Sequence, residues 1–170
     1  MKVADAIAQW LQDKNITCAF GVIGAGNLEI WNAITRLQKT RIVCQHHEQA
    51  CVMAAGAYYR ISGRISVALI TTGAGSTNAI TGVASCYMDS TPVIVISGNE
   101  ASKYMREPTR VLGVQGYPSM EVVKPLAKLS VRPMLIEIPS TLRFAYDIAL
   151  APRQGPCYVD IPKDYQSAAV

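Results

Sequence analysis

Residues 66–78 read SVALITTGAGSTN, and this stretch decides the fold class. Residues 66–71 form an apolar run without the period-two alternation of a half-exposed strand, which predicts a strand buried on both faces. Residues 73–78 then turn the chain into a helix that we expect to run to about Met88. A buried strand that leads through a tight turn into a helix is the repeating unit of α/β proteins.

The same unit recurs on both sides of this stretch. Apolar runs predict further strands, apolar residues at helical spacing predict the helices between them, and Asn27 is the expected cap of the second helix. We expect strands at residues 17–21, 42–44, 92–97, 128–131 and 157–161, and helices at residues 3–11, 28–37, 47–61, 119–126 and 140–150. The predicted fold class is therefore α/β, with a parallel sheet covered on both faces. The polar residues 99–118 are expected to form a long functional loop.

Length and composition limit the chain to one domain and exclude some classes of function. With 170 residues, 50% of them apolar, it can bury one core and is too short for two ordinary domains. Charged residues make up 16%, so part of the surface is expected to meet a partner. The net charge of +4 comes from scattered Lys and Arg, so we predict neither nucleic-acid nor membrane-surface binding.

The chain start and the cysteines indicate the compartment. Residues 1–5 enter the first helix without the regions of a signal peptide, and no apolar stretch approaches the length of a membrane span. The 5 cysteines form no C-x-x-C pair, so a reducing cytoplasm is the simplest expectation. Zinc binding by Cys44, His46, His47 and Cys51 is an alternative, although this spacing matches no common zinc module.

Two segments place a G-x-G sequence between a strand and a helix, where backbone amides and the helix dipole can hold a phosphate. They are Gly24-Ala25-Gly26 and Gly73-Ala74-Gly75. Neither is a dinucleotide fingerprint, because both lack the third glycine of G-x-G-x-x-G. Taken alone, each segment is also explained as a tight turn, since glycine suits positions with positive φ.

Glu48 is an unusual charged residue, because it stands in the first turn of an otherwise apolar helix. One interpretation is an exposed carboxylate that complements the helix dipole. The other is a buried carboxylate, which needs a hydrogen-bond donor or a proton because unpaired burial is costly. A ligand nitrogen would supply that partner.

The residues around Glu48 allow weaker hypotheses. His46 and His47 are adjacent at a helix start and point in different directions. They are therefore more readily explained as polar contacts at an entrance or an interface than as one general-base or metal site. A hydrolase triad of Ser90, His47 and Asp89 is a further hypothesis, but the chain has no G-x-S-x-G elbow.

Five blocks acquire a common meaning when the whole chain is considered. They are FGVIGAG at residues 20–26, HEQA at 47–50, TTGAGSTN at 71–78, YMDSTP at 87–92 and GPCYVDIPKD at 155–164. In this order, and over nearly the whole chain, they resemble the acetolactate-synthase branch of the thiamine-diphosphate enzymes. The resemblance implies the amino-terminal pyrimidine domain of that family, a doubly wound, mostly parallel sheet with helices on both faces.

The resemblance also implies roles for individual residues. Glu48 matches the glutamate that hydrogen-bonds N1′ of the cofactor pyrimidine, which favours the imino tautomer that deprotonates the thiazolium C2 for attack on a 2-oxo carbon. Gln115 corresponds to a glutamine that reaches the reacting carbons. The positions that match cofactor-binding or entrance segments are Gly24, Ala25, Gly26, Ala74 and Asn78. The family has Tyr-Pro-Gly-Gly-Ala and Gly-Pro-Gly where this chain has residues 22–26 and 73–75, so the substrate stays open.

The family further implies parts that residues 1–170 do not supply. Its members hold Mg²⁺ and the diphosphate through a Gly-Asp-Gly segment in a carboxy-terminal domain, and no Gly-Asp-Gly occurs here. We therefore expect one pyrimidine-binding domain over residues 1–170, without metal ligands of its own. We also expect a homodimer or higher homo-oligomer, with the helix at 47–61 at the subunit contact. The cofactor would then meet a diphosphate-binding domain of the same or a partner chain.

The predicted function is that of a domain in an enzyme that decarboxylates a small 2-oxo acid, pyruvate or a relative. The enzyme would transfer the acyl-anion equivalent to a second carbonyl. Three alternatives stay open: the small subunit of a split 2-oxo acid decarboxylase, a non-catalytic association module on the same fold, and a nucleotide- or phosphate-binding module built on the two glycine turns.

Overall fold

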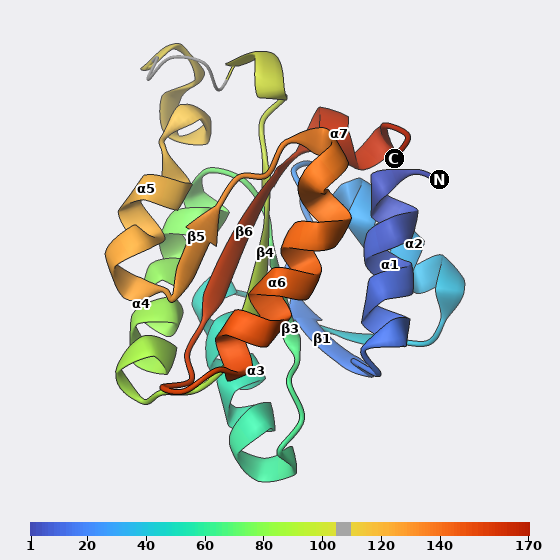
Figure 1. The fold of residues 1–170 in the computed structure, drawn as a ribbon. Coiled ribbons are helices and arrows are strands. Elements are labelled where there is room, and N and C mark those ends of the chain that lie inside the picture. The colour runs from blue at the N-terminus through green and yellow to red at the C-terminus, as the bar shows by residue number, and fades with distance from the viewer. Residues whose placement is uncertain (105–109) are drawn as a thin grey trace.

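A six-stranded sheet forms the centre of the computed structural model, which describes residues 1–104 and 110–170 (Figure 1). The strands are β1 (Cys18–Gly21), β2 (Arg41–Cys44), β3 (Val67–Ile70), β4 (Ile94–Asn99), β5 (Leu129–Val131) and β6 (Cys157–Pro162). Their order is β2-β1-β3-β4-β6-β5, and every neighbouring pair is parallel. The predicted α/β class and all the predicted strands are confirmed.

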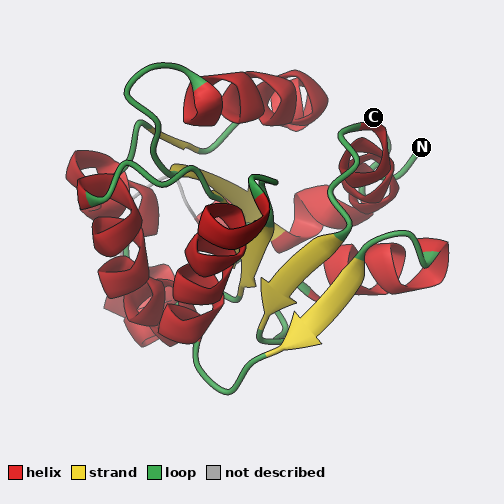
Figure 2. Ribbon diagram, turned by 90° about the horizontal axis from the view of Figure 1, so that it is seen from below, coloured by secondary structure: helices red, strands yellow, loops and turns green. Residues whose placement is uncertain are grey.

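Helices cover both faces of this sheet, because the chain winds outward from β1 to β2 and then returns past β1 to β3 and β4. One face carries α1 (Val3–Asp13), α2 (Leu28–Leu37), α6 (Ile138–Leu150) and α7 (Lys163–Ser167). The other face carries α3 (Glu48–Ser62), α4 (Ala74–Met88) and α5 (Ser119–Val123). Figure 2 shows helices on both sides of the strands, which confirms the doubly wound arrangement.

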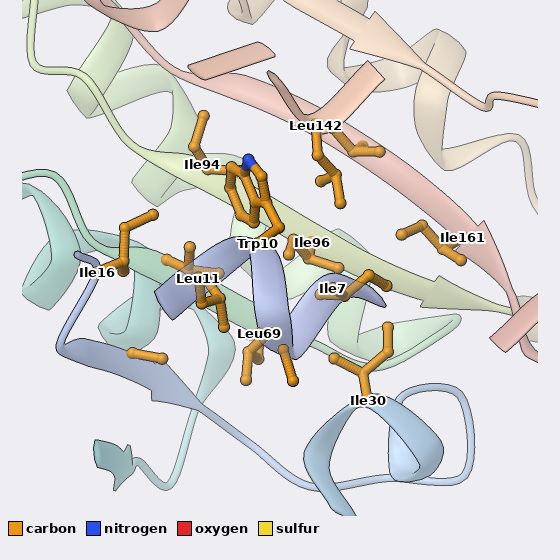
Figure 3. Packing of buried hydrophobic residues seen from close by; sticks show 14 of the residues in the cluster. Ile7, Trp10, Leu11, Ile16, Ile30, Leu69, Ile94, Ile96, Leu142 and Ile161 are labelled. Carbon is orange, nitrogen blue, oxygen red and sulfur yellow. The ribbon is translucent and has the colours of Figure 1, made fainter. Parts of the chain in front are cut away.

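Two apolar cores fill the spaces between the sheet and its helical layers. Alternate residues of β3 serve both cores, with Leu69 on the α1 side and Ile70 on the α3 side. Figure 3 shows the first core, in which Ile7, Trp10 and Leu11 of α1 pack toward the sheet. Full burial of one large aliphatic side chain contributes about 1.5–3 kcal/mol, which explains why the central strands are apolar on both faces.

Several boundaries differ from the prediction. Helix α4 begins at Ala74, so most of the predicted turn at residues 73–78 is already helical. Helix α6 begins at Ile138 because Pro139 fits its first turn, where no amide hydrogen is needed. Strand β4 continues to Asn99, and α7 was not predicted.

The predicted loop at residues 99–118 contains short 3₁₀ turns at Ser102–Tyr104 and Arg110–Gly116. Its residues 105–109 lie outside the described residues. None of the described helices combines the length and the apolar character that crossing a bilayer requires.

Candidate active site

The carboxyl ends of the parallel strands meet at one edge of the sheet, the upper edge in Figure 1, where β6 runs into α7. Open α/β sheets bind ligands outside this edge, at the point where the chain reverses its winding direction. Here that point lies between β1 and β3, because β2 lies on one side of β1 and β3 on the other. The residues that follow β1, β2 and β3 therefore form the candidate site.

Glu48, the first residue of α3, is buried with 6% of its surface exposed. Its Oε2 accepts a hydrogen bond from Asn78 Nδ2 on α4 at 3.0 Å. Its Oε1 lies over Gly75, where a Cβ atom would come within 2.8 Å, and receives no hydrogen bond from the residues that the structure describes. The buried interpretation of Glu48 is confirmed, and the exposed one is wrong.

Gln115 lies at the other end of the turn that leads into α4. Its carboxamide packs on Gly73, where a Cβ atom would lie 2.3 Å from Oε1. Gly73 has φ 63° and ψ −119°, a backbone conformation that favours glycine. Gln115 Oε1 is buried and has no hydrogen-bond partner within residues 1–104 and 110–170. The fold thus brings Glu48 and Gln115, which are distant in sequence, to the two ends of one glycine turn.

The turn after β1 packs directly on the turn after β3. A Cβ atom at Gly24 would lie 2.3 Å from Thr71 Oγ1, and the amide of Gly26 donates to the same oxygen at 3.3 Å. Asn27 clamps this turn, because its Oδ1 accepts from Gly24 N at 2.9 Å and its Nδ2 donates to Val22 O at 3.0 Å. The prediction that Asn27 caps α2 is therefore wrong for its side chain.

Several backbone amides of the two glycine turns already donate hydrogen bonds within the protein, which weakens the phosphate-binding hypothesis. Gly24 N and Gly26 N donate to side chains, and Gly75 N donates to Thr72 O at 3.2 Å. These three amides are therefore not presented to an anion, which favours close packing as the reason for the glycines. All the predicted site residues lie along this one edge, with Ala25 and Ala74 exposed at the turns: Gly24, Ala25, Gly26, Glu48, Ala74, Asn78 and Gln115.

Exposure of His46 and His47 agrees with polar contacts at an entrance, whereas the zinc site and the hydrolase triad do not hold. His46 and His47 are exposed, and His47 Nδ1 accepts from Gln49 N at 3.3 Å, which makes it the cap of α3. Over the described parts of the chain, no three His, Cys, Asp or Glu residues are grouped as metal ligands, so the zinc site is not formed. Asp89 and Ser90 follow α4, at the opposite edge of the sheet from His47, so the triad is not formed either.

Comparison with protein families adds an independent finding. Residues 1–123 match the family model described as thiamine pyrophosphate enzyme, N-terminal TPP binding domain. This segment is well over half of the chain and carries every predicted site residue. The chain belongs to the thiamine pyrophosphate enzyme family.

Similar members of the thiamine pyrophosphate enzyme family extend the match beyond α5. The chain is 37% identical over 165 residues to the acetolactate synthase large subunit of Haemophilus influenzae, which aligns 95% of this chain with 28% of that protein. It is 35% identical over 170 residues to the acetolactate synthase isozyme 3 large subunit of Escherichia coli, with 98% and 28% covered. A probable acetolactate synthase large subunit of Methanocaldococcus jannaschii is 33% identical over 174 residues, with 100% and 28% covered. The chain thus spans little more than a quarter of the length of these relatives.

The thiamine pyrophosphate enzyme domain also holds polar residues that sequence reasoning missed. Thr71 and Thr72 end an apolar strand directly before the glycine turn, and this change from apolar to polar was the available signal. Asn99 and Asp160 stand in strands β4 and β6 and are buried, with 2% and 0% exposed. Nothing in the sequence alone shows that these two side chains meet.

Cys51 lies one turn after Glu48 on α3 and is the thiol that borders this site. Burial, together with the Glu48 carboxylate, raises the pKa of Cys51 from 9.0 to about 12. A thiol with this pKa stays protonated near neutral pH, so Cys51 is a packing residue of the domain and not a nucleophile.

Proposed function

We propose that this chain is the cofactor-activating, amino-terminal domain of an enzyme that uses thiamine diphosphate to decarboxylate a 2-oxo acid. The enzyme would transfer the acyl-anion equivalent to a second carbonyl. The reaction class is taken from relatives that are named acetolactate synthases. The observation that carries the proposal is the buried Glu48 carboxylate, which Asn78 holds through Oε2 while Oε1 receives no donor from the described residues.

The surroundings of Glu48 fit an aminopyrimidine ring. A buried carboxylate requires a donor or a proton, and a protonated ring nitrogen provides one. Gly75 supplies the room for this contact, because a side chain at this position would crowd Oε1. Ala25 and Ala74, both small and exposed, border the same edge. When bound, thiamine diphosphate supplies the electron sink that decarboxylation of a 2-oxo acid needs.

The residues of this chain act by holding protons and positions. Glu48 Oε1 would share a proton with a bound ring nitrogen, while the hydrogen bond from Asn78 holds the carboxylate in place. Gln115 would direct its carboxamide toward the reacting carbons, as the family resemblance implies, and its Oε1 is free of any hydrogen bond to a described residue. The packed turn of Gly24-Ala25-Gly26 bounds the ring and the substrate entrance.

The proposed enzyme needs further parts. We propose that Mg²⁺ and the diphosphate are held by a diphosphate-binding domain of the same or a partner chain. We also propose a homodimer or higher homo-oligomer that covers the α3–α4 layer, where Met53, Ile61 and Met88 are 38%, 89% and 70% exposed. A cytoplasmic location agrees with the free state of the five cysteines.

The proposal is tested by Glu48→Gln in the enzyme assembled with its diphosphate-binding domain. The amide keeps the shape of the side chain but cannot share the ring proton in the same way, so turnover of pyruvate should fall by at least about 100-fold. The matched control is Glu121→Gln, since Glu121 is an exposed glutamate of α5 and its loss should leave turnover unchanged. Wild-type turnover of the Glu48→Gln enzyme would refute the proposed role.

Titration of the assembled protein separates the remaining alternatives. Thiamine diphosphate with Mg²⁺ should bind in preference to ATP, and preference for ATP would favour the nucleotide-binding module. Binding of neither compound would favour the non-catalytic association module. If turnover appears only when a separately encoded diphosphate-binding chain is coexpressed, the split decarboxylase is supported.

A further inference from the structure

Asp160 is a buried carboxylate on β6 that the proposed reaction does not use. None of its surface is exposed. Asn99 Nδ2 donates to Oδ1 and Oδ2 at 2.9 and 2.8 Å, and Arg132 Nε donates to Oδ2 at 2.7 Å. Burial raises the pKa of Asp160, and Arg132 and Asn99 oppose that rise. Donors from two other strand ends therefore hold this carboxylate in one orientation.

Asn99 links Asp160 to the candidate site through hydrogen bonds at both ends of its side-chain amide. Its nitrogen faces Asp160, so its Oδ1 faces the other way and accepts from Thr72 Oγ1 at 3.3 Å and from Glu100 N at 2.8 Å. A reversed amide would place its oxygen against the carboxylate of Asp160, where two acceptors would meet. Asp160 thereby determines which end of Asn99 faces Thr72.

Thr72 is the residue directly before Gly73, the glycine on which Gln115 packs. The network fixes the turn from this side, and Ser76 Oγ donates to Gly73 O at 2.8 Å from the other side. Gln115 is so close to Gly73 that even a Cβ atom would not fit between them. A shift of the turn must therefore displace the carboxamide of Gln115.

Tyr117, two residues after Gln115, lies against the same turn. Its hydroxyl is buried near the Ser76 hydroxyl and forms no hydrogen bond to a described residue. Burial raises the pKa of Tyr117, and the Ser76 hydroxyl opposes that rise. Buried polar groups therefore lie next to both partners of the contact between Gln115 and Gly73: Thr72 beside Gly73, and Tyr117 near Gln115.

We propose that Asp160, Asn99 and Thr72 form a positioning network that places the Gln115 carboxamide over Gly73. All three residues act through the turn. The effect on catalysis rests on the proposed function, whereas the effect on the turn and on the 112–118 segment rests on the contacts alone. Thr72 is the link to test, because its hydroxyl is the last group of the network before the turn.

The experiment compares Thr72→Val with Thr40→Val. Both threonines are buried, with 8% and 6% exposed, and Thr40 donates to Ile16 O at the opposite edge of the sheet. Valine keeps the shape and removes the hydroxyl in each case. Thr72→Ser keeps the hydroxyl and removes only the methyl group, so it is the conservative control variant. Hydrogen exchange of amides at residues 73–78 and 112–118 is measured in the full chain, and kcat and KM for pyruvate in the assembled enzyme.

Loss of the Thr72 hydroxyl should accelerate exchange at both segments about three- to tenfold, as expected for one lost hydrogen bond. It should lower kcat roughly 10- to 100-fold, the effect of a misplaced reacting group, with little change in KM. Thr40→Val should change neither value, and Thr72→Ser should recover most of both.

Equal exchange in Thr72→Val and Thr40→Val would overturn the network. So would a kcat of Thr72→Val equal to that of Thr40→Val in an active enzyme. Failure of the proposed function looks different, because the wild-type assembly would then show no turnover while the exchange difference between the two variants remained.

Discussion

The two edges of the sheet bury polar groups of different kinds. At the amino edge, Thr40, Ser66 and Thr91 are buried hydroxyls, and each donates to a backbone carbonyl. At the carboxyl edge, hydroxyls such as those of Thr72 and Ser76 are joined by two buried carboxylates and three buried carboxamides, of which all but Asn27 bond to an element distant in sequence. They are Glu48, Asp160, Asn27, Asn99 and Gln166.

This difference separates structural polar groups from groups that prepare a site. A buried hydroxyl on a carbonyl costs little, because it is neutral and one backbone acceptor satisfies its donor. A buried carboxylate is costly unless several donors surround it, and removal of one partner leaves an uncompensated charge. Buried carboxylates and carboxamides are concentrated at the carboxyl edge, where the chain reverses its winding direction. This is the pattern expected where residues are selected for function at some cost in stability.

The largest expected effect on stability comes from removal of the central carboxylate. Asp160→Ala leaves Arg132 and the Asn99 amide without their acceptor, so we expect a loss of about 3–5 kcal/mol in the free energy of unfolding. Ser66→Ala, at the amino edge, removes one hydroxyl donor and should cost about 1 kcal/mol. Urea unfolding of both variants measures the difference. Equal losses would remove the distinction between the two edges.

The sequence predicts the scaffold of the carboxyl edge better than its contacts. Apolar runs predict the strands because a strand that is buried on both faces, such as β3, has an apolar residue at every position. Glu48 could be singled out because it interrupts an apolar helix, but its partner Asn78 is on another helix, and only the fold shows that they meet.

Asn99 and Asp160 escaped prediction for a related physical reason. A polar residue near the end of an apolar run usually indicates that the strand has ended, which is why β4 was predicted to stop at residue 97. In the fold, strands β4 and β6 are neighbours, and their two polar residues satisfy each other. Pairing between segments this far apart in sequence depends on the strand order, and local patterns do not contain that order.

A smaller effect is expected from a matched pair of glycine substitutions. A Cβ atom at Gly98 of β4 would lie 1.9 Å from Gly26 O, a backbone atom that cannot rotate away, so Gly98→Ala should cost about 3 kcal/mol. Gly63 ends α3 at the amino edge with φ 69° and has nothing within 4 Å of such an atom, so Gly63→Ala should cost about 1–2 kcal/mol through backbone strain alone. Thermal or urea unfolding of both variants is the measurement. If Gly98→Ala proves no costlier than Gly63→Ala, the close packing of the turns at the carboxyl edge is wrong.

The smallest expected effect is on the pH dependence of stability. It tests whether the two edges differ in their access to water or only in their polar partners. Burial raises the pKa of Cys51, near the carboxyl edge, and of Cys157, at the amino edge, from 9.0 to about 12. A raised thiol pKa means that the folded state keeps the proton, so stability is complete below pH 9.0 and falls as the pH rises toward 12. Cys51→Ala and Cys157→Ala should therefore both flatten the alkaline decline of the urea midpoint, and to a similar extent. A flatter decline in Cys157→Ala alone would mean that water reaches the surroundings of Cys51, and the carboxyl edge would then differ from the amino edge in hydration as well as in its polar partners.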